Sequence, residues 1–314
     1  MLTSLYISPL ESCNLACKYC YTRKTKNILT NKQILGFVKR YRSYLTSKNQ
    51  NLGSITFCGG EVFTLKSFPC LVNNLLKLGI FITIITNGTI DQLDKINDPQ
   101  NCQLLVSLDG PKEIHDKNRG GGNFAKSIDF INHALSLGFP VGIFFLITKD
   151  SYKYKDSFPR SLITDYRLPV TVTYLTDRLG SLTPAQVINI KQNYPTFPGK
   201  NLGCSQISLQ SNGLIYSCCE SPISIGKLSD PIKKIVTDFS NLLSTCQNCK
   251  LFNNFEINKF EHSLKIENCE AKRSPSQTEK LKISCSGCCD PKYNCGYSQD
   301  LHLPSCQDVI KYFS

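Results

Sequence analysis

The first half of the chain alternates between two hydrophobic patterns. One is typical of β-strands and recurs in six runs of apolar and β-branched residues, at 2–8, 54–58, 80–86, 102–108, 141–148 and 170–176. The other has the spacing of amphipathic helices and lies between the strands, at 31–46, 67–78 and 123–137. This α/β alternation predicts right-handed crossovers and a parallel sheet, either doubly wound or rolled toward a barrel. In both cases we expect the chemistry on loops that follow the strands.

Some residues in these segments have expected positions. Thr30 is suited to cap the first helix, and Asn123 is the N-cap candidate at the start of the third. The apolar face of the third helix is expected to comprise Phe124, Ile128, Ile131 and Leu135. Cys70 and Cys102 are interpreted as core thiols.

The pattern changes after about residue 195. Gly, Ser, Asn, Pro and Cys dominate there, and periodic segments are limited to 231–243 and 306–313. This part cannot bury much apolar surface, and it holds eleven of the 17 cysteines. We therefore expect metal ligation to supply part of its folding free energy. A boundary near 195–200 predicts two domains, 1–195 and 196–314.

Composition narrows the cellular setting. No apolar run approaches the ~18 residues that a membrane-spanning helix needs, and Met1–Ser4 lacks the features of a signal peptide. We therefore expect a cytoplasmic protein without a membrane partner. Thiols stay reduced in that compartment, so 17 cysteines favour metal or cluster ligation over disulfides. The net charge of +12 leaves open nucleic acid, an anionic cofactor, an acidic protein, or charge spread over solvated faces.

Three cysteines follow the first predicted strand within eight residues. Cys13, Cys17 and Cys20 have C-x3-C-x2-C spacing. Three thiolates can hold three irons of a [4Fe–4S] cluster and leave the fourth iron open to a non-protein ligand. A zinc site needs a fourth ligand, and no histidine is local. Zinc or structural cysteines remain the alternatives.

This motif, with the aromatic Tyr19 before its last cysteine, resembles that of the radical S-adenosylmethionine (SAM) superfamily. The resemblance implies that SAM chelates the open iron, and that one electron cleaves SAM to a 5′-deoxyadenosyl radical, which abstracts hydrogen. It covers about residues 3–176. It implies a partial (β/α)6 TIM-like barrel with its active face at the carboxyl ends of the strands.

Segments after the next three strands are similar to further motifs of that family. Gly59, Gly60 and Glu61 match its GGE element, whose backbone and carboxylate are implied to receive the SAM ammonium. Asn87, Ser107 and Arg119 match segments of the peptide-modifying branch, which implies contacts with the nucleoside and polar groups of SAM. An ordinary Asn–Gly turn and a surface arginine are the plain alternatives. For Asp109 and His115, functional and structural roles remain equally open.

The cysteines of the second half resemble the SPASM extension of radical SAM peptide-modifying enzymes, which binds two auxiliary [4Fe–4S] clusters. The resemblance implies an inner set, Cys204, Cys218 and Cys289, with Cys219 a candidate fourth ligand, and an outer set, Cys246, Cys249, Cys285 and Cys306. Cys269, Cys288 and Cys295 are unplaced, and a 35-residue spacer, 250–284, replaces five residues of the family pattern. One cluster, or a pair of zinc knuckles at the two C-x2-C pairs, is the alternative.

Together these motifs predict a radical SAM/SPASM enzyme. It would abstract hydrogen from a peptide or protein side chain, giving oxidation or a cross-link, as in sulfatase maturation or the maturation of ribosomally made peptides. Positional candidates for catalysis are Tyr174, Asp177 and Arg178, after the sixth strand. Because Met1 lies close to the first strand, we expect a separate leader-recognition protein or docking by the spacer, and the positive charge favours an acidic leader. The electron donor is expected to be a flavodoxin or ferredoxin.

Two other functions remain open. The same cofactors could act on a small molecule such as a tetrapyrrole precursor. A non-catalytic iron–sulfur or zinc module could instead bind RNA through a basic surface, although the chain lacks the aromatic signature of the RRM fold. Reductive cleavage of SAM would separate the enzymes from the binding module.

Overall fold

The computed structural model describes most of the first two thirds of the chain. The described residues are 3–20, 22, 24–166, 168–174, 182, 183, 185, 186, 189, 190, 206–216 and 224–247. Among the helices of this part, none has the length and apolar character needed to cross a membrane.

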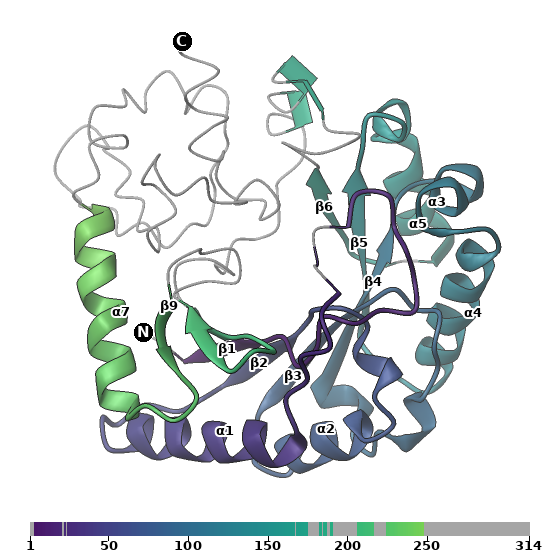
Figure 1. The fold of residues 1–314 in the computed structure, drawn as a ribbon. Coiled ribbons are helices and arrows are strands. Elements are labelled where there is room, and N and C mark those ends of the chain that lie inside the picture. Colours follow the sequence, from purple (N-terminus) through teal and green to yellow (C-terminus); the bar gives the residue numbers. More distant parts are fainter. Residues whose placement is uncertain are drawn as a thin grey trace, which may run out of the picture.

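A single nine-stranded sheet organises the fold (Figure 1), with the order β6-β5-β4-β3-β2-β1-β7-β8-β9. The strands are β1 (Ser4–Ile7), β2 (Ser54–Phe57), β3 (Phe81–Thr86), β4 (Cys102–Leu108), β5 (Val141–Ile147), β6 (Val170–Tyr174), β7 (Gln206–Leu209), β8 (Leu214–Tyr216) and β9 (Ser224–Lys227). The first six strands are parallel and adjacent in chain order. A doubly wound sheet would reverse its strand order at a switch point. The partial (β/α)6 barrel is therefore confirmed.

Helices cover the outer face of the curled sheet (Figure 1). They are α1 (Asn31–Thr46), α2 (Phe68–Leu76), α3 (Lys112–Arg119), α4 (Asn123–Ser136), α5 (Ser157–Tyr166) and α7 (Ile232–Gln247). The helices expected from periodicity at 31–46, 67–78 and 123–137 are confirmed to within two residues. Thr30 caps α1 as expected and forms a capping box with Gln33.

The two faces of the sheet differ in burial, and β3 shows this clearly. Ile82 and Ile84 are fully buried, whereas Thr83 and Ile85 are partly exposed. Side chains alternate between the two faces of a strand, so the buried set lies under the helices and the other set faces the inside of the half-barrel. The apolar outer layer fixes the scaffold, and the inner face keeps accessible side chains.

Three expectations about side chains are corrected. Leu135 is 40% exposed, because the buried face of α4 runs through Phe130, Ile131 and Ala134. Cys102 is a core thiol, but Cys70 is exposed on the outer side of α2. Asn123 is the first residue of α4 and Gly122 is its N-cap, so Asn123 is not the cap.

The described residues after 205 extend the same sheet. Strand β7 pairs in parallel with β1, and β8 and β9 add antiparallel strands at that edge. Helix α7, expected at 231–243, packs against β9 and α1. The Arg40 guanidinium of α1 donates to the carbonyl oxygens of Leu228 and Asp230, which holds the turn between β9 and α7. The division into domains at 195–200 stays a prediction.

Candidate active site

The segment between β1 and α1 carries the three N-terminal cysteines across the carboxyl ends of β2, β3 and β4 (Figure 1). Its ends are paired by an antiparallel bridge between Leu10 and Ile28. Cys13 and Cys17 are partly buried, and Cys20 is exposed. We call residues 8–29 the cysteine loop.

The end of β2 supports the cysteine loop through backbone contacts. The Gly60 amide donates to the Leu10 carbonyl at 2.9 Å, and the Glu61 amide donates to the Ser12 carbonyl at 3.0 Å. A Cβ atom at Gly60 would lie 1.8 Å from the Ser12 oxygen, so a larger residue is excluded there. The close approach of the backbone at Gly60 to the backbone at Ser12 therefore requires glycine. The sequence did not indicate this role for Gly60.

The Glu61 side chain points into the protein and is 1% exposed. It accepts hydrogen bonds from the Phe63 amide at 3.1 Å, the Thr86 hydroxyl at 2.9 Å and the Asn87 amide at 2.8 Å. Burial raises the pKa of this carboxyl, and the amides of Asn87 and Phe63 oppose that rise. Glu61 thus ties the end of β2 to the end of β3.

The turn after β3 reaches the first cysteine. The side-chain nitrogen of Asn87, Nδ2, donates to Oδ1 of Asn14 at 3.1 Å and lies 3.8 Å from the Cys13 sulfur. Gly88 has φ +68°, a conformation that favours glycine, and Ser127 of α4 donates to the Asn87 carbonyl at 2.8 Å. Asn87 is therefore in a tight turn and also next to the expected cluster ligand.

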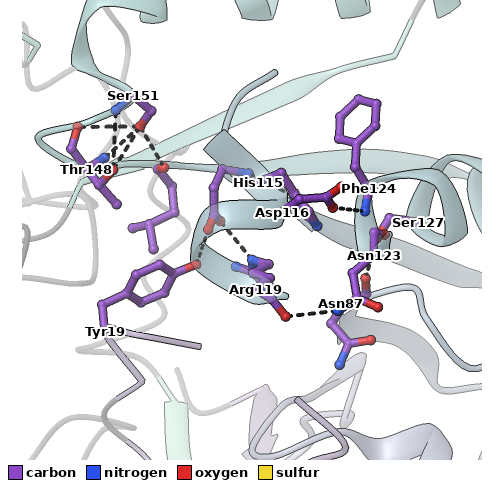
Figure 2. Close-up of polar contacts among 12 residues, drawn as sticks. Tyr19, Asn87, His115, Asp116, Arg119, Asn123, Phe124, Ser127, Thr148 and Ser151 are labelled. Carbon is purple, nitrogen blue, oxygen red and sulfur yellow. Dashed lines mark hydrogen bonds and ion pairs between the residues drawn. The ribbon is translucent and has the colours of Figure 1, made fainter. Parts of the chain in front are cut away.

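The end of β4 holds the other side of the loop (Figure 2). The Tyr19 hydroxyl donates to Asp109, and Arg119 Nε donates to the second oxygen of Asp109 at 2.8 Å. The Lys18 amide also donates to the Asn118 carbonyl of α3 at 3.1 Å. Burial raises the pKa of Tyr19 well above its usual value, so the phenol stays protonated and can donate.

His115 and Ser107 lie close to this group. His115 is fully buried, its Nδ1 accepts from the Asp109 amide at 3.4 Å, and its ring meets Phe124 edge-on. Burial lowers its pKa to about 4, so it is neutral at pH 7. The geometry fits a structural role for His115. Ser107 is 8% exposed on β4, two residues before Asp109.

The three thiols of the cysteine loop are suited to bind a [4Fe–4S] cluster, because each thiolate can bind one iron and three of them leave the fourth iron open. Burial raises the pKa of Cys13 and Cys17, so ligation would release protons from them.

Comparison with known sequences identifies the family. Residues 7–155 match the profile of the Radical SAM superfamily. This segment, just under half of the chain, belongs to the radical SAM superfamily. It is 29% identical over 151 residues to the Fe-coproporphyrin III synthase of Methanosarcina barkeri, covering 45% of this chain and 36% of the relative. It is 33% identical over 134 residues to a cysteine-type anaerobic sulfatase-maturating enzyme of Clostridium perfringens, covering 37% and 35%. The matched region of this radical SAM protein thus spans about a third of the length of each relative.

Solved structures share the fold of this radical SAM protein. Native anSMEcpe with bound AdoMet and the Cp18Cys peptide has a TM-score of 0.64 at 19% identity, over 99% of this chain and 95% of that one. Streptococcus suis SuiB bound to S-adenosylmethionine has a TM-score of 0.61 at 17% identity, over 74% and 65%. At these identities the likeness concerns the fold.

Several expected site residues lie outside the described residues. They are Asp177, Arg178, Cys204, Cys218, Cys249, Cys285, Cys289 and Cys306, together with the four cysteines left open and the spacer. Cys246 is in the last turn of α7, and Tyr174 is the last residue of β6. Contacts join Tyr19, Glu61 and Asn87 to the cysteine loop or to its neighbours, and Arg119 reaches it through Asp109. Ser107 lies on β4 two residues before Asp109. Sequence reasoning missed Asn14 and the Tyr19–Asp109 bond, for which no local pattern exists.

Proposed function

We propose that this protein is a radical SAM enzyme that abstracts hydrogen from a side chain of a peptide or protein, leading to oxidation or a cross-link. The observation that carries the proposal is that the ends of β2, β3 and β4 all hold the cysteine loop in place. The contacts come from Gly60 and Glu61 after β2, from Asn87 after β3 and from Asp109 after β4. Parallel barrels place their chemistry at that edge. The fold shared with two SAM-bound structures, one of which also holds a peptide, supports the substrate class.

Each part of the site has a role in this proposal. Cys13, Cys17 and Cys20 would bind three irons and leave one open. When bound, the cluster and SAM supply a 5′-deoxyadenosyl radical for hydrogen abstraction. Glu61 would brace the turn that holds Asn87 against the nucleoside, with its carboxylate also near the SAM ammonium, and Arg119 and Ser107 would bind polar groups of SAM. The protein itself binds, orients and excludes water.

The test is reductive cleavage of SAM. Anaerobically reconstituted protein, reduced with dithionite, should convert SAM to 5′-deoxyadenosine. A variant with Cys13, Cys17 and Cys20 replaced by Ala should not, while its folding stays that of the wild type. Absence of 5′-deoxyadenosine from iron-loaded wild-type protein would refute the proposal and favour a non-catalytic module.

We also propose two auxiliary [4Fe–4S] clusters, bound by the cysteines after residue 200 and serving substrate binding or electron acceptance. This predicts about 12 iron and 12 sulfide per chain, of which the triple variant loses about four. Stoichiometric zinc with about four iron would show that the second half binds zinc instead.

A second candidate function rests on one of the relatives. The Fe-coproporphyrin III synthase match favours a tetrapyrrole or another small molecule as substrate. Incubation of the loaded enzyme with a tetrapyrrole precursor of iron coproporphyrin, and separately with acidic peptides, would separate the two classes. Turnover of the tetrapyrrole precursor alone would replace the peptide proposal.

A further inference from the structure

A buried carboxylate joins the cysteine loop to the segment that holds Arg119. Asp109 follows β4 and is 0% exposed. The Tyr19 hydroxyl donates to its Oδ2, and Arg119 Nε donates to its Oδ1 at 2.8 Å (Figure 2). One oxygen therefore holds the cysteine loop, and the other holds the last residue of α3.

This contact fixes the orientation of the Arg119 guanidinium. Asp109 accepts from Nε, and the guanidinium carbon lies 5.8 Å from the centre of the Tyr19 ring. A guanidinium presents its donors as a rigid planar fork. An acceptor on the Nε side leaves the two terminal nitrogens free for a second, bidentate acceptor. Within the described residues, no protein acceptor lies on those two nitrogens.

The chemistry of SAM indicates what that acceptor is. SAM carries a sulfonium, an ammonium and a carboxylate, and the carboxylate is its one anionic group. Arg119 is a cation with a side chain 10% exposed, and Asp109 raises its pKa against the opposing effect of burial. A fixed, partly buried cation with a free fork fits a carboxylate.

We propose that Asp109 is a positioning residue that sets the cysteine loop and the SAM carboxylate site relative to each other. It holds the loop through Tyr19, and it presents the terminal nitrogens of Arg119 to the SAM carboxylate. The inference rests on the proposed function, because it takes the cluster and SAM as the ligands. A purely structural Asp109 would only neutralise Arg119, and Tyr19 would add nothing to the cofactor site.

Two variants separate the two contacts. Tyr19→Phe removes one hydroxyl and keeps the ion pair, whereas Asp109→Asn weakens both contacts. Asp150→Asn is the matched control, because Asp150 pairs with Lys117 at 2.6 Å on the surface, where its side chain is 44% exposed. The readouts are the rate at which a chelator removes iron from the anaerobically loaded protein and the dissociation constant of SAM.

We expect Tyr19→Phe to lose iron about tenfold faster than the wild type, with little change in the affinity for SAM. Asp109→Asn should lose iron faster and also bind SAM about tenfold more weakly. Asp150→Asn should change neither. Wild-type iron loss in Tyr19→Phe would overturn the loop half of the proposal, and wild-type SAM affinity in Asp109→Asn would overturn the arginine half.

Asp109→Asn leaves a buried cation without its partner, and this can unfold the protein. Arg119→Lys then takes its place, since lysine keeps the charge but lacks the fork. Arg119→Lys should bind SAM about tenfold more weakly and keep wild-type iron-loss kinetics. Unchanged SAM affinity would contradict the inference.

The wild type separates this inference from the proposed function. If the wild type itself fails to load iron or bind SAM, the proposed function is refuted. If the wild type does both and the variants match it, only the role of Asp109 is refuted.

Discussion

Glu61 illustrates how a motif residue can act through its neighbours. Three donors from the ends of β2 and β3 fill much of the capacity of its carboxylate. One of these donors is the Asn87 amide, which places the Asn87 side chain next to Cys13. The role that we propose for Glu61 in SAM binding is therefore accompanied by a bracing role, and the two predict different effects on stability.

Glu61→Gln tests the bracing role. A glutamine amide cannot accept on its nitrogen side, so at least one of the three buried donors loses its acceptor. We expect a loss of about 1–3 kcal/mol in the free energy of unfolding, measured in urea, and weaker SAM binding in calorimetry with iron content retained. Glu113→Gln, at an exposed position of α3, is the control and should change neither. If Glu61→Gln weakens SAM binding without loss of stability, direct contact is its main role.

At this scale the motifs predicted which residues gather, but not what each one touches. The C-x3-C-x2-C spacing and Glu61 were recognisable because they lie at the ends of predicted strands. The contact of Gly60 with Ser12 joins residues 48 positions apart, and that of Tyr19 with Asp109 joins residues 90 positions apart. Such contacts depend on how the loop crosses the sheet, which no local pattern records.

At the scale of elements, the start of α4 is stabilised from outside the helix. Its N-cap is Gly122, which has no side chain to accept a bond. Asp116 of α3 accepts instead from the Phe124 amide at 2.8 Å and the Gly122 amide at 3.0 Å. This contact also fixes the helix that carries Ser127, which supports the Asn87 turn.

Asp116 predicts a pH dependence of stability. Burial would raise its pKa, but the amides of Phe124 and Gly122 outweigh burial and lower it. A carboxyl whose folded pKa lies below its unfolded value stabilises the protein above that unfolded value, about 3.9, and the contribution is lost as the pH falls through the folded pKa. We expect Asp116→Asn to cost about 1 kcal/mol at pH 7, and less as the pH falls below about 4. Urea unfolding across this pH range measures the difference in free energy between the variant and the wild type, and Asp129→Asn, at an exposed position, is the control. A difference that does not change with pH would contradict the role of Asp116 at the start of α4.

The pattern predicted the strands of the first half better than those after residue 205. Helix α1 and the first six strands follow from periodicity and from the capping residue Thr30. Strands β7, β8 and β9 are about as short as β1 and β2, but the Gly, Ser and Asn around them interrupt the apolar pattern. Tertiary pairing with β1 stabilises β7, and the local sequence carries no sign of it.

At the scale of the whole molecule, the positive charge is concentrated. Residues 12–60 contain nine Lys or Arg and no Asp or Glu, against a net charge of +12 for the chain. This stretch includes residues 12–29 of the cysteine loop, where Lys18, Lys24 and Lys26 are exposed, as is Cys20. An exposed cationic surface beside the expected cluster favours approach of an acidic electron donor.

Charge reversal near the cysteine loop should therefore slow reduction by a flavodoxin. We expect Lys18→Glu and Lys26→Glu to lower the rate of reduction at low ionic strength, and added salt to remove the difference. Lys48→Glu, an exposed change after α1, should have a smaller effect, and reduction by dithionite should be the same in all variants. Stopped-flow spectroscopy measures these rates; equal rates in Lys18→Glu and Lys48→Glu would exclude steering by the loop.

The central claim is that the cysteine loop holds a cluster whose open iron binds SAM. Electron–nuclear double resonance on the reduced, iron-loaded protein with SAM labelled with ¹⁵N at its amino group tests this directly. We predict a hyperfine coupling of the label to the cluster in the wild type and its loss when Cys13, Cys17 and Cys20 are replaced by Ala. A wild-type protein that holds reduced clusters and binds SAM but shows no such coupling would contradict the account.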